Sequence, residues 1–399
     1  MAQSVTVEES NGRVINTSKI RTKFHSILSE SGTVHIGETM NNVSRSLVLG
    51  MLGGFHTLLF GPPGCNKSGV IRDMYSRVLM ALYFELLSSL YATKEDLVGP
   101  IDMAAMDAGI WRRNYKGRAP EAHLMYVDET LECPDGLLKE MHPIMNERVF
   151  HNGAKVIPVP LISMAGATNA DPEDVEGREA FLDRFLMRFL VGQVSDISEL
   201  KAIRDMNQKK VLGELATATS DRTTITLEEL QACRSEVDNV VISDSVNSTF
   251  GKIYKKMKTE SINITNRRAV ECDRIIRASA WLRGSEEAET EDMSMLTWAL
   301  WQGPKDVDVI VKMLAEYAKD AESRARELLN AVKSAKRSWD SADDRKKREE
   351  LQLKAKSIIQ KMNFLMKQKK NEGKTGTLKV LMEAYKEASS LVRDMNSHP

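Results

Sequence analysis

The alternation of apolar and polar residues is clearest between Gly37 and about Val194. Short apolar runs rich in β-branched residues alternate there with stretches of helical periodicity. We expect strands at His56–Phe60, His123–Val127 and Leu161–Ala167, and helices at Gly69–Leu90 and Gly136–Met145. Strands that alternate with helices predict a parallel sheet with helices on both faces. This region is therefore predicted to be an α/β domain.

The pattern becomes helical after Asp196. Helical periodicity covers Ile197–Leu215, Leu227–Lys258 and Asn266–Leu282, and a capping-type start follows at 290–293. From about Val307 the pattern is long and charged, and turn-forming residues at 341–344 and 371–374 divide it into three helices. A small all-α domain and a helical bundle are predicted.

The residues up to Glu30 are polar and show no period, which predicts a tail or a short docking arm. The expected organisation is then a tail at 1–30, an α/β core at 31–195, an all-α domain at 196–305 and a helical bundle at 306–399.

Composition narrows the classes of function. The 399 residues exceed one usual core, and 56 basic side chains balance 56 acidic ones, so no overall charge recruits nucleic acid or a membrane. The Lys-rich stretches at 345–348 and 367–370 are typical of solvated helix faces. Four cysteines without paired spacing and the lack of a long apolar run predict a soluble, cytoplasmic protein with no membrane segment.

Candidate chemistry begins directly after the first predicted strand. The run Gly61-Pro62-Pro63-Gly64-Cys65-Asn66-Lys67-Ser68-Gly69 is similar to a phosphate-binding loop, in which backbone N–H groups hold phosphates, Lys67 reaches the terminal phosphates and Ser68 binds Mg²⁺. The usual pattern has Gly before the lysine, where this chain has Asn66. Taken alone, the motif suggests nucleotide binding.

Two carboxylates, Asp128 and Glu129, follow the second predicted strand. In open α/β sheets the carboxyl ends of strands bind ligands, so Asp128 is expected to support Mg²⁺ and Glu129 to orient and deprotonate water. A strand that ends in two surface acids is the alternative. Asn169, after the third strand, can donate to a phosphate and accept from the attacking water, or it is a turn residue before Asp171-Pro172.

Arginines supply the remaining candidates. Arg184 and Arg188 share one face if they lie on a helix, and an arginine offered to a neighbouring subunit stabilises charge in phosphoryl transfer. Thr265 or Asn266 caps a helix that carries Arg267 and Arg268, either of which could contact phosphate. Surface ion pairs or a basic turn explain these arginines equally well.

Taken in order, these segments resemble the MoxR family of AAA+ ATPases, most closely its RavA-like branch, from about Gly37 to Trp301. Further matching segments are Thr93–Pro100, Pro120–His123, Met145–Gly153, Ala167–Asn169, Leu182–Phe185 and Ile275–Gly284. Each match is weak alone, but their order along the chain is specific.

The resemblance implies an AAA+ αβα core with a five-stranded parallel sheet, an all-α lid, and a C-terminal helical bundle outside the match. It also implies ATP/ADP and Mg²⁺ as cofactors, with Lys67 and Ser68 as Walker A ligands. Asp128 and Glu129 become Walker B, Asn169 sensor 1, Arg184 a trans-acting finger and Arg267 sensor 2, with Arg188 and Arg268 as alternates. A hexameric homo-oligomeric ring is implied, remodelling a protein client with a partner that contains a von Willebrand factor A (VWA) domain.

Three functions stay open at this point. The leading one is an ATP-driven remodelling enzyme. The second is a nucleotide-switched assembly protein whose turnover is slowed by Asn66. A nucleic-acid motor is the third, and the balanced charge and the lack of interleaved aromatic and basic residues argue against it.

Overall fold

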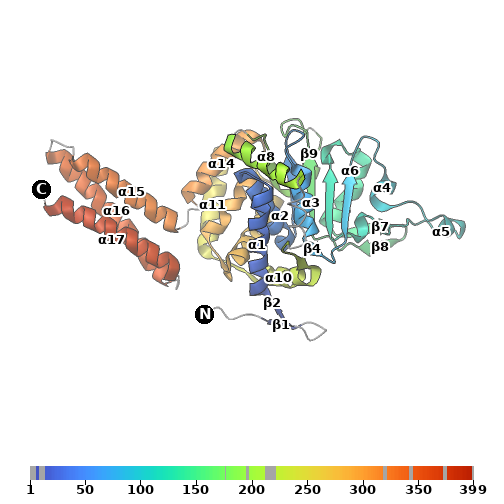
Figure 1. The fold of residues 1–399 in the computed structure, drawn as a ribbon, viewed down its shortest axis with the longest axis horizontal. Coiled ribbons are helices and arrows are strands. Elements are labelled where there is room, and N and C mark those ends of the chain that lie inside the picture. Colours follow the sequence, from blue (N-terminus) through green and yellow to red (C-terminus); the bar gives the residue numbers. More distant parts are fainter. Residues whose placement is uncertain are drawn as a thin grey trace. The chain divides into compact units, whose positions relative to one another are not determined.

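The computed structural model describes residues 6–8, 14–175, 177–194, 197–211, 222–317, 321–340, 345–371 and 375–397. The chain divides into two compact units, Met1–Leu314 and Ala315–Pro399. The first unit contains a central sheet with helices around it, and the second consists of long helices (Figure 1).

The sheet of the first unit has five parallel strands. Their order is β10 (Phe185–Leu190), β3 (His56–Phe60), β9 (Ser163–Thr168), β6 (Leu124–Asp128) and β5 (Tyr83–Leu87). The expected five-stranded parallel sheet is thus confirmed. The strand expected at His56–Phe60 has those bounds, and the other two expected strands lie within two residues of their observed ends.

Helices cover both faces of this sheet. On one face, Ser163 of β9 lies 3.2 Å from the hydroxyl of Tyr75 in α3 (Lys67–Ser76), which packs beside α2 (Glu38–Gly53). On the other face, Phe185 packs against Phe181 of α7 (Glu179–Leu182), and Phe181 stacks on His142 of α6 (Asp135–Asn146). Helices therefore bury both faces of the sheet, as is usual for a parallel sheet.

The helix expected at Gly69–Leu90 is too long. Helix α3 ends at Ser76, and β4 (Val78–Leu79) and β5 follow it. Strand β5 is the edge of the sheet, where Phe84 and Leu86 are buried while Leu87 is exposed. The alternation of buried and exposed residues in β5 spans only five residues. This is too short to distinguish the strand from a continuation of the helical pattern before it.

The prediction of a polar tail over residues 1–30 is wrong from Val14 onward. Strand β2 (Val14–Asn16), paired with β1 (Thr6–Glu8), leads into helix α1 (Thr17–Val34). Three α1 side chains, Ile20, Phe24 and Ile27, are at most 2% exposed. Their spacing of four and three residues places them on one face of the helix. Three apolar residues are enough to form this buried stripe, even though the rest of the segment is polar.

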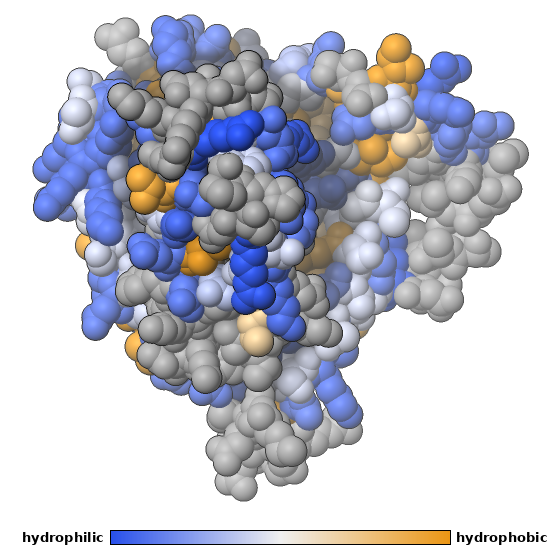
Figure 2. All heavy atoms as spheres, turned by 90° about the vertical axis from the view of Figure 1, so that its left-hand side faces the viewer, coloured by the Kyte–Doolittle hydropathy of each residue, from blue (hydrophilic) through white to orange (hydrophobic). Residues whose placement is uncertain are grey.

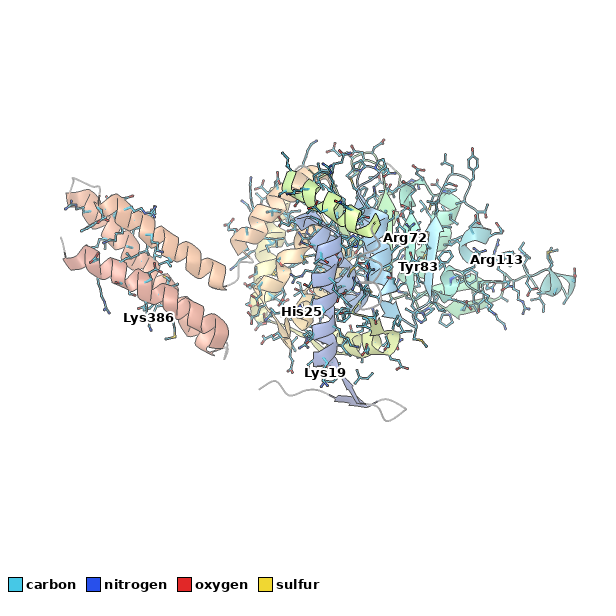
Figure 3. All side chains as sticks on the ribbon, viewed as in Figure 1. Lys19, His25, Arg72, Tyr83, Arg113 and Lys386 are labelled. Atoms are coloured by element: carbon cyan, nitrogen blue, oxygen red, sulfur yellow. The ribbon has the colours of Figure 1, made fainter. Side chains whose placement is uncertain are left out.

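Two excursions leave the core between its strands. The first contains α4 (Lys94–Val98) and α5 (Met103–Asp107), and the second is the hairpin of β7 (Val149–Asn152) and β8 (Lys155–Pro158). The Arg113 guanidinium donates to a Glu95 carboxylate oxygen at 2.8 Å and to the Gly99 carbonyl at 2.9 Å (Figure 3). Asn152 also bonds the Arg113 backbone in both directions, so the hairpin holds the first excursion in place.

The remainder of the first unit is mainly helical. After α8 (Ile197–Val211) come β11 (Ile225–Thr226), α10 (Leu227–Asn239), β12 (Val241–Ile242), α11 (Asp244–Thr259), α12 (Asn266–Arg283), β13 (Glu287–Ala288), α13 (Thr297–Leu300) and α14 (Pro304–Tyr317).

Two of the helices expected in this part differ from the observed ones. The expected helix at Leu227–Lys258 is two helices, because the β-branched residues of β12 interrupt it and Ser243 caps α11. The end of the expected helix Ile197–Leu215 lies outside the described residues. Thr265 is the N-cap of α12, one of the two caps expected there, and it accepts from the Arg268 N–H.

The second unit is a bundle of α15 (Ala321–Asp340), α16 (Arg345–Asn371) and α17 (Thr375–Ser397). Its core surrounds Trp339 and Met362, and Lys336 pairs with Asp394 across α15 and α17. Three helices were expected from Val307 onward, but α14 is an additional helix, and its residues up to Leu314 belong to the first unit. The expected break at 341–344 lies outside the described residues, and of the one expected at 371–374 only Asn371, the last residue of α16, is described.

The face drawn in Figure 2 is predominantly hydrophilic in its coloured residues. Apolar residues appear on it only in small, separate groups. Individual apolar residues on a surface are normal and carry no functional signal.

Candidate functional site

The loop between β3 and α3 adopts backbone conformations that its sequence can support. A Cβ added at Gly61 would lie 2.0 Å from the Val191 carbonyl oxygen, so only glycine fits there. Gly64 has φ +82° and Asn66 has φ +60°, both in the left-handed region. Asparagine is one of the few other residues that adopt this region readily, which explains how Asn66 replaces the usual glycine.

Lys67, the first residue of α3, has a largely buried side chain that bridges two segments. Its ammonium donates to the carbonyls of Gly61 and Pro62 and, at 2.9 Å, to Oδ1 of Asn169. Burial lowers the pKa of Lys67, while Cys65, Glu129 and Asp128 oppose that shift. The ammonium therefore lies inside the loop, next to the position after β9.

Asn169 connects this lysine to a carboxylate. Its backbone N–H donates to Glu129 Oε2 at 3.2 Å, and its side-chain amide donates to Glu129 Oε1. Glu129 itself has φ +49°, a left-handed conformation that turns the chain sharply after β6. Lys67, Asn169 and Glu129 thus form one continuous polar chain across β3, β9 and β6.

Ser68 and Asp128 form a second polar pair beside the first. The Ser68 hydroxyl donates to Asp128 Oδ2 at 3.2 Å. The hydroxyl of the buried Tyr126 lies beside this pair, and burial, together with Asp128, raises the pKa of this phenol. The hydroxyl of Ser68 and the carboxylate of Asp128 are oxygen ligands that suit a hydrated cation.

Among the residues that the structure describes, no group of three or more His, Cys, Asp or Glu side chains could hold a metal ion. Mg²⁺ needs few protein ligands, because water and substrate phosphates supply the others. The pair Ser68 and Asp128 therefore fits Mg²⁺ bound together with a phosphate.

Five predicted site residues meet at the carboxyl edge of the sheet: Lys67, Ser68, Asp128, Glu129 and Asn169. The position of β9 between β3 and β6 brings Asn169 to these strand ends. Parallel strands present their carboxyl ends together, which is where α/β sheets bind ligands.

Arg184 lies at the opposite ends of the strands, that is, at their amino ends. It precedes β10, whose first residue Phe185 pairs with His56, the first residue of β3, whereas the phosphate loop follows Phe60 at the other end. Four steps of about 3.3 Å separate these ends by roughly 13 Å. The Arg184 guanidinium donates to the Ala180 carbonyl, and its buried Nε has no partner within the described chain.

Arg267 lies near Arg184. Burial and the charge of Arg267 both lower the pKa of Arg184, and Arg267 donates to Asn146 Oδ1 at 2.7 Å and pairs with Glu271. Its side chain is 42% exposed. The structure therefore does not bring Arg184 or Arg267 to the phosphate loop of their own chain.

The alternates Arg188 and Arg268 are buried. Arg188 lies in strand β10, so it does not share a helical face with Arg184, and it donates to the Trp301 carbonyl. Arg268 donates to the carbonyls of Ala299 and Phe185. Both guanidinia are engaged by backbone oxygens inside the unit, which indicates a structural role.

Sequence reasoning missed Tyr126, Asn146 and His35 as parts of these clusters. Tyr126 is one apolar position of a strand pattern, and Asn146 ends a helix. His35 lies next to Asn66, with 2.9 Å between His35 Nδ1 and Asn66 Nδ2. Tertiary packing alone brings these residues to the site, so no local signal marks them.

Family models match both the α/β core and the helical region that follows it. Residues 23–234 match a family model described as the MoxR domain in the MoxR-vWA-beta-propeller ternary systems, and residues 245–314 match the AAA lid domain. No helix in the described parts of the chain is long and apolar enough to cross a membrane.

Two proteins are similar to this chain in sequence, and one solved structure is similar to it in fold. The uncharacterised protein MJ0079 of Methanocaldococcus jannaschii is 31% identical over 287 residues, which are 72% of each chain. The uncharacterised protein MJ0812 of the same organism is 29% identical over 286 residues, 71% of this chain and 74% of that protein. A crystal structure described as that of a putative ATPase from Cytophaga hutchinsonii aligns with a TM-score of 0.56 at 17% identity, covering 75% of this chain and 96% of the other, and shows the shared fold.

The expected AAA+ core with a helical lid is confirmed by the sheet and by the lid match. The matches do not single out the RavA-like branch, which stays a prediction. Because the family model covers more than half of the residues and the relatives match over most of their length, the chain belongs to the MoxR family of AAA+ ATPases.

Proposed function

We propose that this protein hydrolyses ATP and uses the energy to remodel a protein partner. The observation that carries the proposal is the polar chain from Lys67 through Asn169 to Glu129, next to the pair Ser68 and Asp128. It combines a cation for phosphate, a carboxylate for water and oxygen ligands for Mg²⁺ at one edge of the sheet.

Each residue has a proposed role. Backbone N–H groups of the loop from Gly64 to Gly69 and the Lys67 ammonium bind the phosphates of ATP or ADP. Ser68 and Asp128 hold Mg²⁺, which neutralises charge that develops on the phosphates. Glu129 accepts a proton from the attacking water, and Asn169 holds Glu129 and senses the terminal phosphate.

Nucleotide binding would change the contacts of Lys67. In the structure its ammonium donates to the carbonyls of Gly61 and Pro62 and to Asn169. Phosphate oxygens compete for the same donor, and charge-assisted bonds to phosphate are stronger than bonds to neutral carbonyls. Release of Asn169 from Lys67 would then free this amide to rearrange with Glu129.

Arg184 and Arg267 are proposed to act on the nucleotide of a neighbouring copy. They lie near one another at the amino edge of the sheet, about one strand length from their own phosphate loop. Arg184 is held there by its guanidinium, which donates to the Ala180 carbonyl. This arrangement supports a homo-oligomeric ring, which we propose is a hexamer.

The partner proposed is a protein with a VWA domain, because the matching family model is described from MoxR-vWA-beta-propeller systems. A RavA-like chaperone role is part of the same proposal. All four cysteines are free thiols, which supports a reducing, cytoplasmic location.

Steady-state hydrolysis of Mg-ATP tests the enzyme proposal. We expect turnover by the unmodified protein, loss of nucleotide binding in Lys67→Ala, and retained binding with at least a hundredfold lower turnover in Glu129→Gln. Equal, slow hydrolysis by the unmodified protein and Glu129→Gln would refute it and favour the nucleotide-switched assembly protein.

Mixing experiments test the role of Arg184 between copies. Arg184→Ala should bind nucleotide normally but not hydrolyse it, because its phosphate loop is intact. Mixed with Lys67→Ala subunits, which keep Arg184, it should recover part of the activity. Assembled mixed oligomers that stay inactive contradict a role in trans.

A further inference from the structure

Asn66 is held by a neighbour that the phosphate-loop motif does not include. Its backbone is left-handed, with φ +60°, at the position where the motif usually has glycine. A Cβ added at Gly69 would lie 2.0 Å from Asn66 Oδ1, so the amide oxygen occupies the space above this glycine. The other end of the amide, Nδ2, lies 2.9 Å from Nδ1 of His35.

His35 is enclosed and has a defined hydrogen-bonding pattern. It follows α1, is 3% exposed, and its Nε2 lies 3.2 Å from Asp73 Oδ2. The Asp73 carboxylate also binds the guanidinia of Arg77 and Arg222. A carboxylate held by two guanidinia is an acceptor, so His35 Nε2 carries the proton and Nδ1 accepts from Asn66.

We propose that His35 is a positioning residue for nucleotide binding, which holds Asn66, and through it the phosphate loop, in the conformation that receives phosphates. The inference rests on the proposed function and adds a residue outside the loop to the binding site. A glycine at position 66 would need no such support, whereas an asparagine in the left-handed region is stabilised when its side chain is fixed.

The same contacts extend beyond the loop. Arg77 donates to Glu30 of α1, and the Thr223 hydroxyl donates to Glu30 as well. Asp73 is thus the centre of a polar cluster that joins α3 to α1 and to the residues before β11. The surroundings of His35 are fixed by several ion pairs, so its ring is a rigid support for Asn66.

A double-mutant cycle separates this role from simple packing. Dissociation constants for ADP are measured for the full chain with His35 or with His35→Gln, each with Asn66 and with Asn66→Gly. Glutamine can keep the donor to Asp73 but has no acceptor where Nδ1 lies. With Asn66, we expect His35→Gln to bind ADP about fivefold more weakly, the value of one net hydrogen bond.

With Asn66→Gly, the same change at His35 should alter ADP affinity by less than twofold, because no amide remains to be held. The inference is overturned if His35→Gln changes ADP affinity by factors that agree within twofold with Asn66 and with Asn66→Gly. If the unmodified protein does not bind ADP, the proposed function fails and the inference fails with it, which is a distinct result.

A second variant covers the case in which His35→Gln does not fold. His35→Asn can offer its amide oxygen near the position of Nδ1 and loses the contact with Asp73. It should keep ADP affinity within twofold of the unmodified protein even if its melting temperature falls. An affinity loss of fivefold or more in folded His35→Asn overturns the inference, since the acceptor is retained there.

Discussion

Replacing Arg268 should destabilise the protein far more than replacing its neighbour Arg267. The Arg268 side chain is 2% exposed and donates to the carbonyls of Ala299 at 2.7 Å, Phe185 at 2.8 Å and Leu186 at 3.1 Å. It therefore joins α12 to the start of β10 and to α13. Arg267 is 42% exposed and bonds only Asn146 and Glu271 among the described residues.

The magnitude follows from the groups left behind. Methionine at position 268 keeps much of the side-chain volume but leaves three carbonyls without their donor, and each buried unsatisfied group costs about 1–3 kcal/mol. Because such losses do not add fully, we expect about 3–5 kcal/mol in the free energy of unfolding. At about 2 °C per kcal/mol, the melting temperature should fall by about 6–10 °C.

The assay is thermal unfolding of nucleotide-free protein, followed by calorimetry or intrinsic fluorescence. Arg267→Met is the matched control, with the same substitution one residue away, and should change stability by less than about 1 kcal/mol. A melting temperature of Arg268→Met within 2 °C of the unmodified protein would refute the reasoning, as would equal losses in both variants. Turnover should fall in Arg267→Met despite its stability.

Three further changes have defined outcomes. Gly69→Ala would bring its Cβ against Asn66 Oδ1, so ADP affinity measured by titration should fall, and Asn66→Gly should restore it. His56 is fully buried, and burial and the charge of Arg148 hold its pKa well below the usual value, so the unfolded state binds more protons below about pH 6.5 and stability is lost as pH falls. His56→Gln should flatten that acid limb in denaturant titrations by at most about 1.4 kcal/mol per pH unit. Trp301→Ala, which removes a 1% exposed ring and its bond to the Arg188 carbonyl, should cost about 3–5 kcal/mol in the same titrations.

The core strands and their ligand residues could be predicted because their signals are local. A short apolar run such as His56–Phe60 is buried on both faces and ends directly in the loop that follows it. Asp128 is likewise the last residue of β6, and Glu129 and Asn169 follow β6 and β9 without a gap. In a parallel sheet, residues that follow adjacent strands meet at one edge, so sequence order was sufficient to bring them together.

The missed elements have weak local patterns. Helix α1 has only three apolar residues on its buried stripe within a polar sequence. Strand β5 has five residues at the edge of the sheet, where its alternation is too short to separate from the helix before it. In both cases the structure depends on burial against distant parts of the chain, which the local sequence pattern does not show.

The contact between His35 and Asn66 could not be predicted for a different reason. The two residues are separated by 31 positions and by the whole of α2 and β3, and no spacing rule connects them. The unusual residue at position 66 was visible in the sequence as a departure from the motif. Its explanation needed the backbone angle, which shows a conformation that asparagine tolerates and most side chains do not.

Sequence order also could not show which edge of the sheet each candidate occupies. Arg184 follows Asn169 by only 15 positions, yet the register of Phe185 with His56 puts it at the amino edge, whereas Lys67 lies beyond the carboxyl edge. On the proposed roles, nucleotide binding then needs the residues of one copy, and hydrolysis needs an arginine from a second. If these proposed roles hold, the direction of the strands couples assembly to turnover, because Arg184 and the phosphate loop of one copy lie at opposite ends of the strands.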